Sequence, residues 1–135
     1  MNNVVPDLIG RVCTRLVCQQ YWHEGELAEE ANVTFLQVDA EQWHRFLIDW
    51  GEPFWKVVDG PDKWNTTPMD EFHCPQIELA GCWGLVGRTI GAAGFVQIDR
   101  ASEFRIVFSG GLTLVLHNNE DDRNTLYVRA SAAHV

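Results

Sequence analysis

Four cysteines and five histidines are the side chains of this chain that could bind a metal or act as nucleophiles. The cysteines are Cys13, Cys18, Cys74 and Cys82. They form two pairs with four and seven intervening residues, whereas structural zinc sites use two closely spaced pairs. His23 and His73 would complete a ligand set only if the fold brought them there. We therefore expect free thiols and no bound metal.

The sequence contains none of the common catalytic motifs. His23 begins His-Glu-Gly-Glu-Leu, which lacks the second histidine of a zinc protease helix. There is no Gly-x-Ser-x-Gly nucleophile elbow, phosphate-binding loop or dinucleotide-binding glycine run. His44 and Asp49 lie five residues apart on one predicted strand, so their side chains point to opposite faces. The sequence predicts a non-catalytic protein without a cofactor.

Tryptophan is unusually frequent, with six copies, five of them between positions 22 and 64. Trp43, Trp50 and Trp55 gather around one predicted hairpin, where large aromatic side chains most simply fill a core. The alternative is a ligand pocket lined by Trp43, His44 and Trp55. Strand alternation places Trp43 and Trp50 on opposite faces, so one of these two lies away from the main core.

Acidic side chains outnumber basic ones by 19 to 10, which gives a net charge of −9. This balance argues against binding nucleic acid or an anionic membrane, since both need a basic surface. It leaves either solubility alone or a basic protein partner. The acidic loops that could contact such a partner are 26–30, 59–62, 70–71 and 120–122. The candidate contacts are Asp59, Asp62, Asp70, Glu71, Glu120, Asp121 and Asp122.

Short segments of the first half recur in the second half in the same order. Residues 8–11 (LIGR) match 85–88 (LVGR), and residues 36–39 (LQVD) match 96–99 (VQID). Each copy then runs through an apolar stretch into a glycine turn. These matches predict a duplication that relates 8–58 to 85–130, with chance similarity as the alternative.

Period-two alternation predicts the strands that carry these residues. Residues 103–130 read as a three-stranded antiparallel meander, because Gly110-Gly111 separates two alternating runs. Residues 33–58 repeat this plan with heavier side chains. Residues 8–22 fit either a helix or a strand, and the matching glycine-rich segment favours a strand. Residues 24–31 contain good helix formers in a stretch too short for a secure helix.

The predicted fold is therefore mainly β and antiparallel. Two related meanders pack as a barrel or a sandwich, with a minor helical element, in one domain of 135 residues. Residues 59–75 form a proline-rich connection. The first residues show no basic and apolar signal pattern, and residues 79–97 lack an uninterrupted apolar run, so we expect a cytoplasmic protein.

One block resembles a known group of proteins. Trp43-His44-Arg45-Phe46, Asp49-Trp50-Gly51 and Phe54-Trp55, followed by Phe108-Ser109-Gly110-Gly111, resemble small acidic bacterial proteins found with polymorphic-toxin and contact-dependent inhibition loci. The resemblance covers about a third of the chain. It implies an immunity-like role in binding a partner. Taken with the acidic charge, the sequence predicts a non-catalytic binding protein, an immunity protein that neutralises a basic toxin domain by occluding it. A small-ligand-binding barrel or an enzyme with a tryptophan-lined cavity is the alternative.

Overall fold

The computed structural model describes residues 5–61 and 72–130, and within these ranges every regular element is a strand. The strands are β1 (Cys13–His23), β2 (Glu26–Val38), β3 (Gln42–Asp49), β4 (Glu52–Val58), β5 (Phe72–His73), β6 (Gln76–Glu78), β7 (Ile90–Ile98), β8 (Ala101–Phe108), β9 (Leu112–Asn118) and β10 (Asn124–Ala130). The prediction of a mainly β, antiparallel fold is confirmed. No helix in the described part of the chain is long and apolar enough to cross a membrane.

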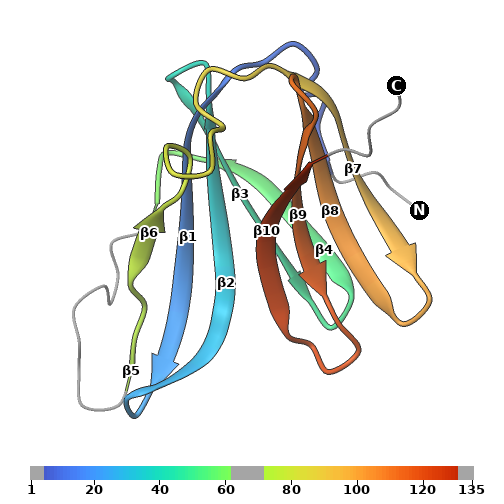
Figure 1. The fold of residues 1–135 in the computed structure, drawn as a ribbon. Helices are drawn as coiled ribbons and strands as arrows, with labels where there is room; N and C mark the ends of the chain where they lie inside the picture. The colour runs from blue at the N-terminus through green and yellow to red at the C-terminus, as the bar shows by residue number, and fades with distance from the viewer. Residues whose placement is uncertain (1–4, 62–71, 131–135) are drawn as a thin grey trace.

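The strands form two antiparallel sheets (Figure 1). The first sheet has the order β4-β3-β2-β1-β5, with β6 also paired to β1, and the second has the order β10-β9-β8-β7. The predicted meander over 103–130 is confirmed as β8, β9 and β10. Residues 13–23 are a strand, as the glycine-rich matching segment indicated. The described strands do not close into a barrel, but the two sheets share one core.

The predicted minor helix is wrong for the described residues. The helix-forming stretch 24–31 instead contains a turn at Glu24-Gly25 and the start of β2. Tyr21 pairs with Glu29 and Trp22 with Leu27, so the segment is held as the second strand of a hairpin. A helix of only eight residues is weakly stable alone, whereas a strand here gains a ladder of hydrogen bonds to β1.

The turns carry the positive φ angles that tight hairpins require. Gly110 and Gly111 have φ angles of 82° and 81°, as expected for a glycine pair between two strands. Asp39 and Asp99, which the repeat matches to each other, both have a φ of 56°. The duplication of 8–58 in 85–130 stays a prediction.

The main core lies between the sheets and is built from alternating positions of both. Its largest fully buried aromatic side chains are Phe46 of β3 with Phe104 and Phe108 of β8. Phe46 and Phe104 meet edge to face, with ring centroids 5.5 Å apart. A second buried cluster contains Val17, Val33, Phe35 and Trp43. These residues alternate with the core positions, so β1, β2 and β3 are buried on both faces.

Candidate partner-binding site at one end of the sheets

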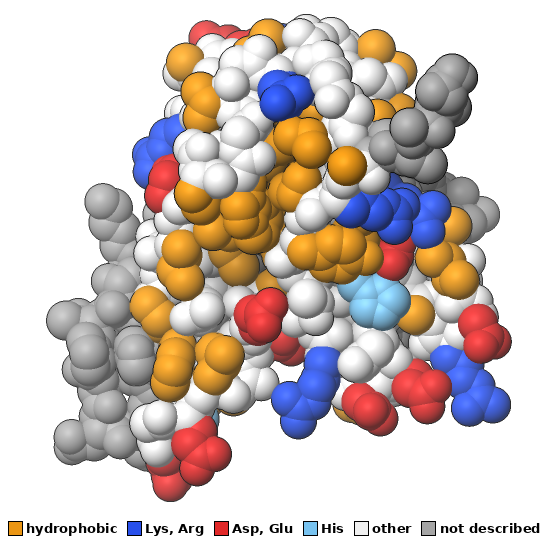
Figure 2. Space-filling view, in the orientation of Figure 1, with side chains coloured by type: hydrophobic (Ala, Val, Ile, Leu, Met, Phe, Trp, Pro, Cys, Tyr) orange, Lys and Arg blue, Asp and Glu red, His pale blue; other side chains and the backbone are white. Residues whose placement is uncertain are grey.

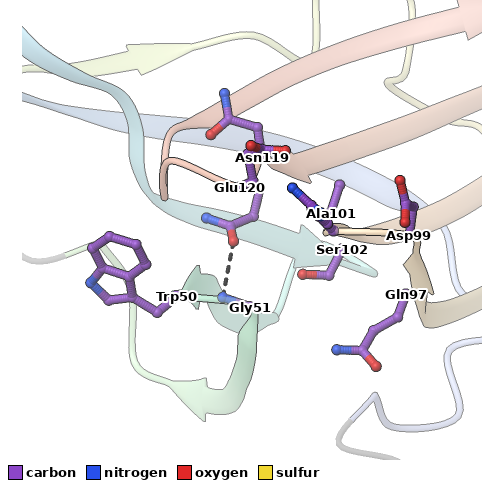
Figure 3. A pocket seen from close by; sticks show the side chains of 10 residues that line it. Trp50, Gly51, Gln97, Asp99, Ala101, Ser102, Asn119 and Glu120 are labelled. Atoms are coloured by element: carbon purple, nitrogen blue, oxygen red, sulfur yellow. Dashed lines mark hydrogen bonds between the residues drawn. The ribbon is translucent and has the colours of Figure 1, made fainter.

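Three turns lie at the same end of the molecule (Figure 1). They line a polar hollow of about 220 Å³, whose side chains are drawn in Figure 3. They are the β3–β4 turn, the β7–β8 turn and the loop between β9 and β10. We call this hollow the Trp50 pocket; it is lined by Trp50, Gly51, Gln97, Asp99, Arg100, Ala101, Ser102, Asn118, Asn119 and Glu120. Both sheets contribute to it, because the β3–β4 turn belongs to the first and the other two to the second.

A network of buried amides joins the two sheets beside this pocket. Asn118 is 2% exposed, and its Oδ1 accepts a hydrogen bond of 3.0 Å from the backbone N–H of Gly51 (Figure 3). Its Nδ2 donates to Asp122 Oδ1 at 2.9 Å and to Asn124 Oδ1 at 3.0 Å. Asn124 in turn donates through Nδ2 to the carbonyl of Ile48 at 3.2 Å. These bonds fix the β3–β4 turn against the β9–β10 loop.

Trp50 is held in this turn in a conformation that its side chain disfavours. Its φ is 47°, in the left-handed region, where a residue with a Cβ costs roughly 1–2 kcal/mol. Its backbone N–H donates to Asp122 Oδ1 at 2.7 Å, which helps to hold that conformation. The indole is 71% exposed and extends away from the other side chains of the pocket (Figure 3). A large aromatic side chain is thus presented to solvent on a fixed backbone.

The end of the molecule around Trp50 carries more acidic than basic side chains. Asp49 and Glu52 flank the turn and pair across β3 and β4, and Asp99, Glu120 and Asp121 lie on the neighbouring turns; all are exposed. Arg100 and Arg123 are the exposed basic side chains of the same turns. Acidic and basic side chains both appear at the lower end of the space-filling view (Figure 2). The balance at this end is therefore negative.

The acidic residues expected to bind a partner do not gather on one surface. Glu120 and Asp121 are exposed beside Trp50, whereas Asp122 turns inward and binds Trp50 and Asn118. Asp122 is therefore a positioning residue rather than an exposed contact. Asp59 is exposed just beyond β4. The remaining candidates lie outside the described residues: Asp62, Asp70 and Glu71.

The alternative pocket of Trp43, His44 and Trp55 does not form. Trp55 Nε1 donates to His44 Nδ1 at 2.9 Å, and the Trp55 ring stacks on Phe46 with centroids 4.4 Å apart, so both belong to the core side of the sheet. Trp43 packs in the second cluster on the opposite face, with the Arg15 guanidinium 5.1 Å from its ring. Adjacent strand positions point to opposite faces, which separates Trp43 from the other two.

His44 is suited to this structural role. It is 1% exposed, and its Nε2 lies 2.9 Å from Gln42 Oε1. Burial lowers the pKa of His44, because the imidazolium form would lose its hydration. A neutral ring can accept the Trp55 bond at Nδ1 and donate at Nε2. Both ring nitrogens are therefore occupied by protein groups.

Sequence reasoning missed a charged cluster on the outer face of the second sheet. Glu103 is 5% exposed, and its carboxylate accepts bonds of 2.7 Å from Arg105 Nε and from His117 Nδ1. Burial opposes ionisation of Glu103, but the bonds from Arg105 and His117 outweigh it and lower its pKa. Glu103 and Arg105 share a face at period two, a pattern visible in the sequence. The contact between Glu103 and His117 could be predicted only with the register of β8 and β9, which places these two residues opposite each other.

The cysteines behave as buried apolar side chains, apart from Cys82. All four are free thiols; Cys82 is exposed and the other three are buried. Burial raises the pKa of Cys13 and of Cys18 to about 12, which leaves neither as a thiolate near neutral pH. Within residues 5–61 and 72–130, no three metal-binding side chains come close enough to hold an ion.

Comparisons of this chain with protein-family models, with curated proteins and with solved structures gave no match in any of the three. Its function is therefore argued from the Trp50 pocket and its surroundings. These provide an exposed aromatic side chain, a fixed backbone and a surplus of carboxylates. Such an arrangement can bind a cationic surface without any chemical step.

Proposed function

We propose that this protein is a non-catalytic binding protein. It recognises a basic segment of another protein through the exposed Trp50 side chain and the acidic turns around the Trp50 pocket. The observation that carries the proposal is the exposed indole of Trp50, fixed in a left-handed turn by Asp122. Strain of this kind persists only where the surrounding structure enforces it, and it gathers at functional sites. The corresponding turn between β8 and β9 uses a glycine, Gly110 with a φ of 82°, where the β3–β4 turn uses Trp50.

Recognition would combine two kinds of contact. The face of the indole attracts an arginine or lysine side chain through a cation–π interaction, worth roughly 0.5–1 kcal/mol at exposed sites and more when water is excluded. Glu120 and Asp121 would steer a cationic surface toward the indole, raising the association rate more than the final affinity. Tryptophan is also among the residue types that most often dominate binding energy at interfaces.

The pre-formed network adds to this binding. Because Asn118 and Asp122 already hold the turn, binding does not need to order the backbone that carries Trp50. Ordering costs oppose association, so a fixed turn retains more of the contact energy as affinity.

The partner that fits these features is a basic toxin domain in the cytoplasm, which this protein would neutralise by occlusion. The negative charge of the chain and the resemblance to immunity-like proteins support this assignment. The proposed role requires neither cofactor nor metal.

A titration with a short arginine-rich peptide tests the proposed recognition. Wild-type protein should give saturable NMR shifts at the Trp50 indole N–H, with an affinity that falls as salt rises, because screening shortens the reach of charges to about 10 Å at 0.1 M. Trp50→Asn should abolish the binding, since asparagine tolerates the left-handed turn but has no aromatic face. Val57→Asn, which changes an exposed apolar residue of β4, is the matched control and should bind normally.

Two results would overturn the proposal. One is an arginine-rich peptide that fails to bind at low salt. The other is binding that survives Trp50→Asn, because the cation would then be held elsewhere.

A further inference from the structure

Strand β7 (Ile90–Ile98) forms the last position of the second sheet, so its outer edge has no strand beside it among the described residues. Only its first residue is covered there: Gly10 N–H donates to the carbonyl of Ile90, and Ile90 N–H donates to the carbonyl of Arg11, both at 2.8 Å. From Ala92 to Ile98, no backbone group of residues 5–61 or 72–130 pairs with this outer edge. Such an edge presents unpaired backbone groups to any extended segment that approaches.

Unlike the edge strands β4 and β10, β7 carries none of the side chains that block the pairing of another strand. Its sequence, IGAAGFVQI, contains no charged side chain and no proline. The edge strand β4 contains Glu52, Pro53 and Lys56, which are the residue types that block strand addition. On β10 the Glu29 carboxylate accepts a bond from the first backbone N–H, that of Asn124, at 3.0 Å. The irregularity between Ile90 and Ala92 disturbs only the start of β7.

Exposed apolar side chains extend this edge into a surface. Nine large apolar side chains of the described residues are exposed, and three of them lie on or beside β7. Ile98 is the last residue of β7, and Val107 of the neighbouring strand β8 pairs with Ala92. Ile9 precedes Gly10, whose N–H donates to the carbonyl of Ile90. This concentration marks β7 and its borders as an interaction surface.

We propose that β7 pairs antiparallel with β7 of a second copy of this chain, around a two-fold axis near Phe95. The open stretch 92–98 is centred on Phe95, so a two-fold axis there pairs all of it. A neutral strand offers nothing to select a charged peptide, whereas it suits its own copy, which is neutral as well. An isologous contact of this kind uses one surface twice and closes at two subunits.

Charges at the two ends of the strand favour the antiparallel direction. Arg11 lies beside the start of β7, and the turn after its last residue carries one acid and one base, Asp99 and Arg100. Antiparallel pairing brings this turn of each copy near Arg11 of the other, so each Arg11 gains a carboxylate neighbour. Parallel pairing would place the two Arg11 side chains at the same end, away from both Asp99 carboxylates. Arg11 already binds Asp39 at 2.8 Å, and its guanidinium has further N–H groups to donate.

Self-association of this kind and the binding of a basic partner have opposite salt dependence. Each copy carries a net charge of −9, so two copies repel, and salt that screens this repulsion should strengthen the dimer. The cationic peptide of the proposed function should bind more weakly under the same conditions. The two proposals can therefore fail independently.

Sedimentation equilibrium over a range of protein and salt concentrations tests the dimer. Wild-type mass should rise reversibly from 15.4 kDa toward twice that value, and further at higher salt. Val96→Lys should weaken the dimer by at least about tenfold, since the two new lysines lie diagonally across the axis at roughly 7–8 Å. Within one chain Val96 pairs with Glu103, so a lysine there has an acidic neighbour.

Val57→Lys on the edge strand β4 is the matched control, because it adds the same charge at an exposed valine of another edge. It should dimerise like wild type, as should Trp50→Asn. If Val96→Lys proves unfolded by circular dichroism, Ala92→Lys, at an exposed position of the same edge, replaces it. A wild type that stays at 15.4 kDa throughout would overturn the proposal, as would a dimer that the β7 lysines leave unchanged.

Discussion

Replacing Asn118, the last residue of β9, by alanine should destabilise the protein much more than replacing Asn119 in the adjoining loop. The Asn118 side chain is buried and makes three hydrogen bonds. One reaches the β3–β4 turn at Gly51, and two hold Asp122 and Asn124, which themselves bond to that hairpin. A hydrogen bond contributes about 1 kcal/mol net, and more when its loss leaves a buried partner unsatisfied. The free energy of unfolding should therefore fall by about 3 kcal/mol.

The expected change is large enough for a simple thermal measurement. Unfolding entropy is about 2.1 cal/mol/K per residue, so for a chain of 135 residues a loss of about 3 kcal/mol lowers Tm by about 10 °C. Circular dichroism with heating, together with urea unfolding, gives both quantities. Asn119→Ala is the matched control, because the side-chain Oδ1 of Asn119 accepts its bonds from the backbone N–H groups of Asp121 and Arg123 within the same exposed loop.

A double-mutant cycle with Asp122→Ala sharpens the test. Asn118 and Asp122 share a hydrogen bond of 2.9 Å, so the two losses should be less than additive by 0.5 kcal/mol or more, roughly the threshold expected for contacting residues. If Asn118→Ala destabilised no more than Asn119→Ala, the network would not be what holds the sheets together at this end. Additive losses would show that Asn118 and Asp122 act separately.

Two further predictions concern titratable groups. Ellman's reagent should rapidly modify one thiol of the native protein, that of Cys82, and should modify all four thiols in denaturant. The variant Cys82→Ser should lose the rapid phase. Rapid reaction of a second thiol in the native protein would contradict the burial of Cys13, Cys18 and Cys74. The stability that Glu103 contributes, measured as the difference in free energy of unfolding between wild type and Glu103→Gln, should be fully present above the ordinary glutamate pKa. Because its folded pKa is lowered, that difference should shrink as the pH falls through the folded pKa, and a difference that grew in acid would refute the ion cluster.

The strands could be predicted because their signal is local. Gly110-Gly111 between two alternating runs fixed the meander of β8, β9 and β10, and both glycines have the positive φ expected of them. The stretch 24–31 misled because helix propensity is also local, whereas its strand conformation depends on pairing with β1. In so short a segment, the hydrogen bonds to a neighbouring strand outweigh the intrinsic helix propensity of the residues.

The candidate site was harder to predict, because it is assembled from distant turns. Glu120 and Asp121 were identified from their charge, but nothing nearby in the sequence indicates that Trp50 lies beside them. Asp122 looks the same as its neighbours in the sequence, yet it faces inward because its φ of 59° turns the chain toward Asn118. Trp43 and Trp55 are close in sequence, and only the strand register shows that they occupy opposite faces.

The strand order has a consequence for how the chain folds. Apart from the pairs that β5 and β6 make with β1, every pair of adjacent strands is also consecutive in sequence. Closing such short loops costs little entropy, so each meander can form early without waiting for the other. The slower event is the docking of the two meanders, in which Asn118 and Asn124 reach the β3–β4 hairpin. Trp50 would then gain its fixed backbone only at the end, which makes the hydrogen-exchange protection of its N–H, bonded to Asp122, a reporter of the last folding step.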